Sequence, residues 1–162
     1  MTILRVGSWA ELFDLVGGEV SIVGGQVFYP HGWEARNMVL VRDLPLVGRL
    51  YVHRLIAEPL RAALTDCAKL APYDLDQVGC FAQRAKSSNP HQLSLHALGL
   101  AVDFNPARNP ARHVAAGSHP SPWWDLPAGW VDAFEARGFV WGGRWGGYVD
   151  PMHFQGVVGP GI

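Results

Sequence analysis

The chain has 162 residues, of which 49% are hydrophobic and 17% charged, and its formal net charge is −1. These values are typical of one globular domain that buries roughly 68–70% of its unfolded surface, and they exclude a disordered chain. The absence of a Lys/Arg block disfavours nucleic-acid binding, which needs a basic surface for phosphates. No apolar stretch approaches the roughly 20 residues that a membrane-spanning helix needs, so no membrane span is expected.

Residues 1–45 are expected to form an N-terminal arm packed on the main body of a single domain that spans residues 1–162. The Ser8–Glu11 spacing is that of a capping box and predicts a short helix that ends at Gly17–Gly18. Short β-type runs follow at Val20–Val23 and Met38–Val41.

The next segment carries the clearest helical pattern. Apolar residues recur at helical spacing from Tyr51 to Leu70 and predict a helix, in which Pro59 indicates either a kink or a late start. The two cysteines, Cys67 and Cys80, fit neither a metal motif nor a disulfide framework, so we expect buried free thiols.

The second half of the chain predicts a small sheet with one helix. The expected elements are strands at Gln77–Gln83, Leu100–Phe104, Phe139–Trp141 and Met152–Phe154, and a helix at Gly129–Arg137 that stops at Gly138. With 19 Gly and 12 Pro, the fold should be rich in loops. We therefore expect an α+β fold, with a small antiparallel sheet and flanking helices.

Three side chains suit a metal ion. Strand alternation turns Asp103 away from the core face of Leu100–Phe104, His96 lies on the loop before that strand, and His153 lies on another strand. Two His and one Asp bind zinc and leave a fourth position for water, which is typical of catalytic sites, whereas structural sites close all four positions. We expect one zinc ion per chain at His96, Asp103 and His153, in a cleft on the sheet.

Two further residues suit amide hydrolysis beside such an ion. Asp150 precedes His153 by three residues, and Pro151 forces it into an extended or turn conformation from which it can reach the same site as the general base. Glu135 is the next candidate for the general base. Arg84 follows the predicted Gln77–Gln83 strand and would stabilise the oxyanion and clamp a carboxylate; a surface ion pair is the alternative.

Substrate contacts are expected from Ser94, Trp141 and Arg144. The glycine-rich segment Trp141–Gly147 precedes Asp150, and it is either a turn anchored by its tryptophans or the wall of a substrate groove.

At these residues the sequence resembles the zinc D-Ala-D-Ala carboxypeptidase family, which includes vancomycin-resistance dipeptidases and phage L-alanyl-D-glutamate endolysins. The family pattern Ser-x-His-x-x-Gly-x-Ala-x-Asp matches Ser94–Asp103, and its closing acid-x-x-His matches Asp150–His153. Gly138–Trp145 is similar to the segment before the last histidine in the endolysin branch. The resemblance covers about Gln77–Gln155 and implies the same zinc ligands, with Asp150 as the base and Arg84 as the transition-state clamp.

The acid before the last histidine indicates which branch of the family is closer. It is Asp150 here, as in the endolysins, whereas the other branches more often carry Glu. The resemblance therefore favours an endopeptidase that cuts the L-Ala–D-Glu bond of peptidoglycan stem peptides. A D-alanyl-D-alanine carboxypeptidase is the alternative with the same chemistry, and a non-catalytic wall-binding module is the alternative of another class. Asp150 and Arg84 argue against the module, because binding alone needs neither.

The expected partners are peptidoglycan stem peptides, and the protein is expected to act as a monomer. Met1–Gly7 lacks the apolar stretch of a signal peptide. We therefore expect synthesis in the cytoplasm without a Sec signal, and delivery to the cell wall by a separate lysis or secretion system.

Overall fold

A computed structural model describes residues 4–86, 89–115 and 121–159. Its helices are α1 (Trp9–Leu15), α2 (Trp33–Asn37), α3 (Arg54–Cys67) and α4 (Ala128–Ala136), with short 3-10 turns η1 (Leu95–Leu98) and η2 (Gly142–Arg144). The strands are β1 (Leu4–Arg5), β2 (Ser21–Val23), β3 (Gln26–Phe28), β4 (Met38–Leu44), β5 (Gly48–His53), β6 (Val78–Gly79), β7 (Ala85–Lys86), β8 (Asn89–Leu93), β9 (Ala101–Phe104), β10 (Arg112–His113), β11 (Val140–Trp141), β12 (Tyr148–Val149), β13 (His153–Gln155) and β14 (Val157–Val158).

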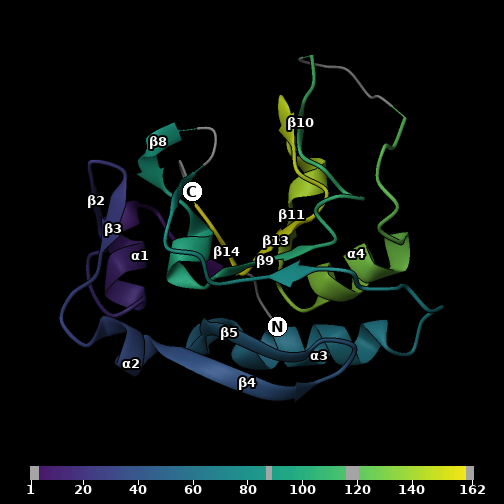
Figure 1. Cartoon of the computed structure of the whole chain (residues 1–162), viewed down its shortest axis with the longest axis horizontal. Coiled ribbons are helices and arrows are strands. Elements are labelled where there is room, and N and C mark those ends of the chain that lie inside the picture. Colours follow the sequence, from purple (N-terminus) through teal and green to yellow (C-terminus); the bar gives the residue numbers. More distant parts are fainter. Residues whose placement is uncertain (1–3, 87–88, 116–120, 160–162) are drawn as a thin grey trace.

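A four-stranded antiparallel sheet in the order β11-β13-β9-β6 lies at the centre of the molecule. In Figure 1, α3 and the β4–β5 ribbon lie below this sheet, and β8 and β10 rise above it on either side. The expected α+β class is confirmed. Within the described residues no helix combines the length and the apolar character needed to cross a membrane.

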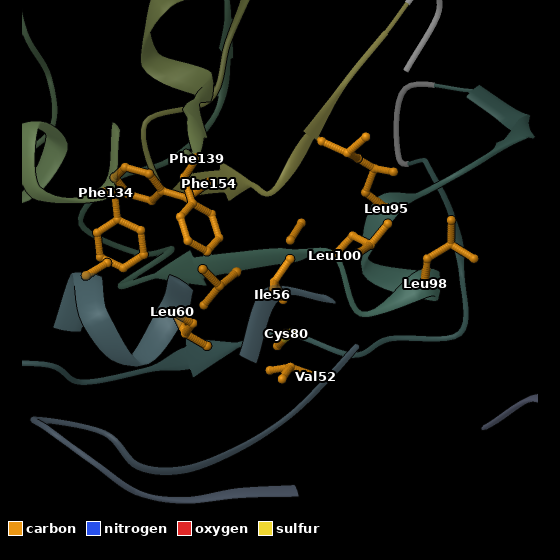
Figure 2. Packing of buried hydrophobic residues seen from close by; sticks show 14 of the residues in the cluster. Val52, Ile56, Leu60, Cys80, Leu95, Leu98, Leu100, Phe134, Phe139 and Phe154 are labelled. Carbon is orange, nitrogen blue, oxygen red and sulfur yellow. The ribbon is translucent and has the colours of Figure 1, made fainter. Parts of the chain in front are cut away.

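The core lies on the lower face of the sheet. Phe154 of β13 packs on Phe134 of α4 with ring centroids 4.5 Å apart, and Ile56 and Leu60 of α3 are buried beside them (Figure 2). Side chains alternate along each strand, so the residues between these core positions point to the upper face. Because Asp103 is paired with His153 in the β9–β13 register, both side chains lie on that upper face.

The N-terminal residues share this core. Strand β1 pairs in parallel with β14, and Leu12, Val16 and Trp33 are completely buried in the same hydrophobic cluster as the sheet residues. The Ser8 hydroxyl accepts a hydrogen bond from Glu11 N–H at 3.2 Å, which confirms the predicted cap of α1. Residues 1–3, which belong to the predicted arm and to the Met1–Gly7 segment, lie outside the described residues.

The predicted start of the long helix at Tyr51 is wrong. Tyr51–His53 forms the end of β5, where pairing with β4 satisfies its backbone, and α3 begins at Arg54. The ring of His53 caps the helix by accepting a hydrogen bond from Leu55 N–H at 3.2 Å. A late start at Pro59 is also wrong, since the helix runs through this proline. Both cysteines are buried and free, as predicted.

The predicted strand at Gln77–Gln83 is too long. Only Val78–Gly79 pairs with β9. Beyond it the chain leaves the sheet, because the Ala82 N–H donates to the carbonyl oxygen of His96 at 3.1 Å. The other predicted elements of the second half are present: β9, β11, β13 and α4, which ends before Gly138 at φ 87°.

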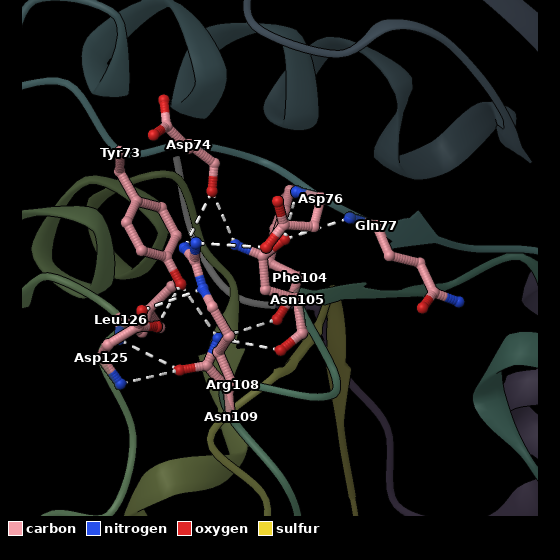
Figure 3. A network of polar contacts seen from close by, with 10 residues as sticks. All are labelled: Tyr73, Asp74, Asp76, Gln77, Phe104, Asn105, Arg108, Asn109, Asp125 and Leu126. Atoms are coloured by element: carbon pink, nitrogen blue, oxygen red, sulfur yellow. Dashed lines mark hydrogen bonds and ion pairs between the residues drawn. The ribbon is translucent and has the colours of Figure 1, made fainter.

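A polar network that the sequence pattern did not reveal holds the far end of β9 (Figure 3). Asn105 has a positive φ of 48°, and its side-chain oxygen accepts from the N–H groups of Asp76 and Gln77 at 2.7 and 3.1 Å. Asn109 is completely buried, and its oxygen accepts from the N–H groups of Asp125 and Leu126 at 3.1 and 3.0 Å. These contacts fix the loops around the strand that carries Asp103.

Replacing Asn109 by alanine is expected to destabilise the fold by about 3 kcal/mol or more. Its amide nitrogen also lies 3.0 Å from both the Tyr73 hydroxyl and the Phe104 carbonyl oxygen. The substitution therefore leaves several buried polar groups without a hydrogen-bond partner, and each such loss lowers the free energy of unfolding by about 1–3 kcal/mol. Urea denaturation measures the change, with Asn89→Ala at an exposed asparagine as the control. A loss below about 1 kcal/mol for Asn109→Ala would contradict this role.

Candidate metal centre

Three of the residues singled out by the sequence converge on the upper face of the sheet. His96 comes from η1, Asp103 from β9 and His153 from β13. The His96 Nε2 lies 3.2 Å from the His153 Nδ1 and 3.1 Å from the Asp103 Oδ2, while the His153 Nδ1 lies 3.0 Å from the Asp103 Oδ1. One ligand atom from each residue thus lies close enough to the others to hold a single ion.

His96 lies on the connection before β9, as predicted, and there it belongs to the 3-10 turn η1. The Ser94 hydroxyl caps η1 by accepting from His96 N–H at 3.3 Å, and Gly99 ends the turn at a φ of 63°. A Cβ at Gly99 would lie 2.8 Å from the backbone nitrogen of His53, so this position requires glycine. The His96 Nδ1–H donates to the carbonyl oxygen of Cys80 at 2.6 Å, which leaves the lone pair on Nε2.

Gln155 fixes the tautomer of His153. The Gln155 side-chain nitrogen donates to the Val157 carbonyl oxygen at 2.7 Å, and this sets the orientation of the amide because a carbonyl only accepts. The Gln155 oxygen therefore accepts from the His153 Nε2–H at 3.2 Å. The lone pair of His153 then lies on Nδ1, the atom that faces His96 and Asp103.

The converging atoms need a positive charge between them. With the single proton of each neutral imidazole committed elsewhere, two lone pairs and a carboxylate meet with no hydrogen among them, unless a histidine takes up a second proton and donates it to Asp103. A tetrahedral ion with bonds of about 2.0–2.1 Å would separate its ligand atoms by about 3.3 Å, close to the observed spacing. The residues therefore fit a divalent metal ion bound through His96 Nε2, the Asp103 carboxylate and His153 Nδ1.

The pKa shifts agree with this arrangement. Burial alone would raise the pKa of Asp103, but hydrogen bonds from His153 and His96 outweigh it and hold the pKa well below its usual range. Burial would lower the pKa of His153, but hydrogen bonding to Asp103 and the Asp103 charge raise it above the usual value. The site therefore favours a cation, which is a proton in the absence of metal.

Asp150 lies beside this cluster. Its carbonyl oxygen accepts from His153 N–H at 3.2 Å, so Asp150–His153 forms the turn expected from Pro151. Burial raises the pKa of Asp150 to about 6, assisted by the charge of Asp103 and opposed by His153, His96 and Arg84. Its buried Oδ1 has no hydrogen-bond partner among the described residues. Asp150 is thus a carboxylate at neutral pH that can accept a proton.

A cavity of about 360 Å³ joins these groups. Its lining comprises Arg84, Lys86, Ser94, Leu95, His96, Asp103, Trp145, Gly146, Tyr148, Asp150, His153 and Gln155. Arg84 is held near the cluster because its carbonyl oxygen accepts from Ser94 N–H at 3.4 Å, next to the turn that carries His96. The structure therefore brings Arg84, Ser94 and Asp150 to one cavity with the three ligands.

Two predicted substrate contacts do not line this cavity. The Trp141 indole N–H donates to the Pro151 carbonyl oxygen at 2.8 Å, so this ring anchors the turn beneath Asp150. Arg144 points outward to an ion pair with Glu135, with Nε and Oε1 2.6 Å apart. The same ion pair holds Glu135, the second candidate for the general base, outside the cavity. Trp145 is the tryptophan of this segment that lines the cavity, with its ring 5.2 Å from that of His153.

Six lining residues were not named as site residues from the sequence, although two of them, Trp145 and Gly146, belong to the Trp141–Gly147 segment that was considered as a groove wall. The six are Lys86, Leu95, Trp145, Gly146, Tyr148 and Gln155. Two of them carried a signal in the sequence. Gln155 follows His153 at a spacing of two, which places both on one side of a strand, and Lys86 has the same spacing from Arg84, although β7 is irregular after Ala85. Leu95 lies between the named residues Ser94 and His96, and the positions of Trp145, Gly146 and Tyr148 depend on how the glycine-rich segment turns, which no spacing rule predicts.

Replacing Gln155 by leucine is expected to weaken zinc binding by about 10–100-fold, the usual range for loss of a partner that orients a ligand histidine. Gln155→Glu keeps an acceptor for the His153 Nε2–H and should retain more affinity. Competition with a chromophoric chelator measures the dissociation constant, and urea denaturation of the metal-free proteins shows whether each variant is folded. Wild-type affinity in a folded Gln155→Leu protein would contradict the role of Gln155.

Comparison with known families gives one match. Residues 87–156 match a family model described as D-alanyl-D-alanine carboxypeptidase. This segment includes the three ligands and Asp150, whereas Arg84 and Lys86 lie just before it, and it confirms the resemblance seen in the motifs. No curated protein and no solved structure matches the chain in the corresponding comparisons.

Proposed function

We propose that this protein is a zinc-dependent peptidoglycan peptidase that hydrolyses the stem peptide, most specifically an L-alanyl-D-glutamate endopeptidase. One observation carries the proposal: two lone-pair nitrogens and a carboxylate converge in one cavity beside Asp150, whose buried Oδ1 has no hydrogen-bond partner among the described residues. The match of residues 87–156 to the carboxypeptidase model supports a peptidase.

The residues of the site divide the work of amide hydrolysis. Zinc held by His96, Asp103 and His153 would supply Lewis-acid activation of the water and of the scissile carbonyl. Asp150 takes the proton of the attacking water and returns it to the leaving amine, and a pKa of about 6 suits both transfers near neutral pH. Arg84, on the wall of the same cavity, stabilises the negative charge that develops on the carbonyl oxygen.

The bond that is cleaved distinguishes the two candidate activities. Asp150 at the position of the acid, as in the endolysin branch, supports the endopeptidase. The description of the matching family supports a carboxypeptidase that removes terminal D-alanine. Mass spectrometry of products from purified cell walls separates them: the endopeptidase releases stem peptides without their L-alanine, and the carboxypeptidase releases free D-alanine. Absence of both products would refute the proposed function.

Metal removal is expected to abolish activity without unfolding the protein. The purified protein should carry about one zinc per chain, and a chelator should inactivate it reversibly. Since the ligands belong to a turn and two strands of a packed sheet, the metal-free protein should keep its structure, unlike small zinc domains that fold only on metal binding. Elemental analysis, circular dichroism and zinc re-addition test this. Full activity in a metal-free preparation would overturn the zinc assignment.

A further inference from the structure

Lys86 is a cation of the cavity to which the proposed mechanism gives no task. It is partly buried on β7 and lines the same cavity as Arg84 and the metal cluster. Among the described residues no carboxylate forms an ion pair with it, and burial lowers the pKa of its ammonium group. A partly buried lysine without a counter-charge is unfavourable unless an anion arrives to pair with it.

The backbone places Lys86 at a defined distance from Arg84. The two residues are separated by Ala85, which pairs with Leu93, and although the β7–β8 register shifts between Ala85 and Lys86, both side chains line the same cavity. Two residues along a strand correspond to about 6–7 Å. A substrate whose scissile carbonyl lies by Arg84 would therefore place a neighbouring group, and not the carbonyl itself, within reach of Lys86.

The charges of the cavity indicate that this group is anionic. Its acids are Asp103 and Asp150, and its basic side chains are Arg84 and Lys86. With a divalent ion on the ligands, the positive charges exceed the negative ones, so the loaded cavity attracts an anionic substrate. Arg84 lies close enough to Asp150 to influence its pKa, whereas Lys86 lines the cavity without an ion pair to an acid among the described residues and is available to the substrate.

The two candidate bonds share one chemical feature at this position. In an L-Ala–D-Glu bond and in a terminal D-Ala–D-Ala bond alike, the residue that supplies the leaving amine carries a free carboxylate on its α-carbon. We propose that Lys86 binds this α-carboxylate and makes the enzyme selective for peptides that carry it over peptides with a carboxamide there. The inference rests on the proposed peptidase function and holds for either bond.

Matched peptides test this selectivity. For the endopeptidase the pair is an L-alanyl-γ-D-glutamyl peptide and its D-isoglutaminyl counterpart, and for the carboxypeptidase it is a peptide ending in D-alanyl-D-alanine and its C-terminal amide. The wild type should prefer the carboxylate by about 10–100-fold in kcat/KM, the range expected for one charged hydrogen bond. Lys86→Met should raise KM for the carboxylate peptide by a similar factor and leave the carboxamide peptide within about twofold.

Two further variants make the result specific. Lys86→Arg keeps the charge and should keep the preference. Lys69 is the other lysine of the chain, exposed and paired with Asp66, so Lys69→Met should behave as the wild type on both peptides. Equal loss on both peptides in Lys86→Met, or an undiminished preference, would overturn the role of Lys86. A wild type that cleaves neither pair would instead refute the proposed function itself.

Discussion

Replacing Asp150 by asparagine is expected to lower kcat by about 10²–10⁴, the usual contribution of a general base, while the protein still binds zinc. The amide keeps the shape of the side chain but cannot take the proton of the attacking water. Asp150 lines the cavity with an unpartnered oxygen, and it is not one of the three converging ligands. Steady-state kinetics on a defined stem peptide and elemental analysis of zinc measure the two effects.

Two comparison variants give this result its meaning. His153→Ala should lose zinc and activity together, because it removes a ligand. Glu135→Gln should leave kcat unchanged, since Glu135 pairs with Arg144 outside the cavity. Near-normal turnover in Asp150→Asn would exclude Asp150 as the base.

Replacing Arg84 by alanine is expected to lower kcat by about 10²–10³, the scale for losing one donor to an oxyanion. Arg84 lines the cavity beside Asp150, and its backbone is bonded to the Ser94 turn. Arg84→Lys should restore little activity, because an ammonium group does not reproduce the planar, two-pronged guanidinium.

The split between kcat and KM decides how Arg84 acts. An arginine that only grips a substrate carboxylate would mainly raise KM on removal, whereas one that stabilises the transition state lowers kcat. Arg36→Ala is the control, since Arg36 is exposed on α2, donates to the His31 carbonyl oxygen at 2.8 Å and does not line the cavity. Unchanged kcat and KM in Arg84→Ala would remove Arg84 from the site.

Local sequence determined the features whose causes are themselves local. The Ser8 cap, the end of α4 before Gly138 and the alternation along β9 depend on residues within a few positions of one another. The candidate metal ligands His96, Asp103 and His153 could also be predicted, because a metal ion requires particular side-chain types and these occur at a recognisable spacing. For the same reason Asp150 could be placed beside His153: Pro151 restricts the intervening backbone whatever surrounds it.

Only the tertiary structure decided the features that depend on contacts distant in the chain. Tyr51–His53 joined β5 and not the helix because β4 offers hydrogen-bond partners there. Arg144 points away from the cavity because it forms an ion pair with Glu135 of α4. The tautomers of His96 and His153 are likewise set by Cys80 and Gln155, and their lone pairs meet because the β9–β13 register brings Asp103 opposite His153. A spacing rule names the ligands, but only the packed sheet and its hydrogen bonds turn their lone pairs toward one point.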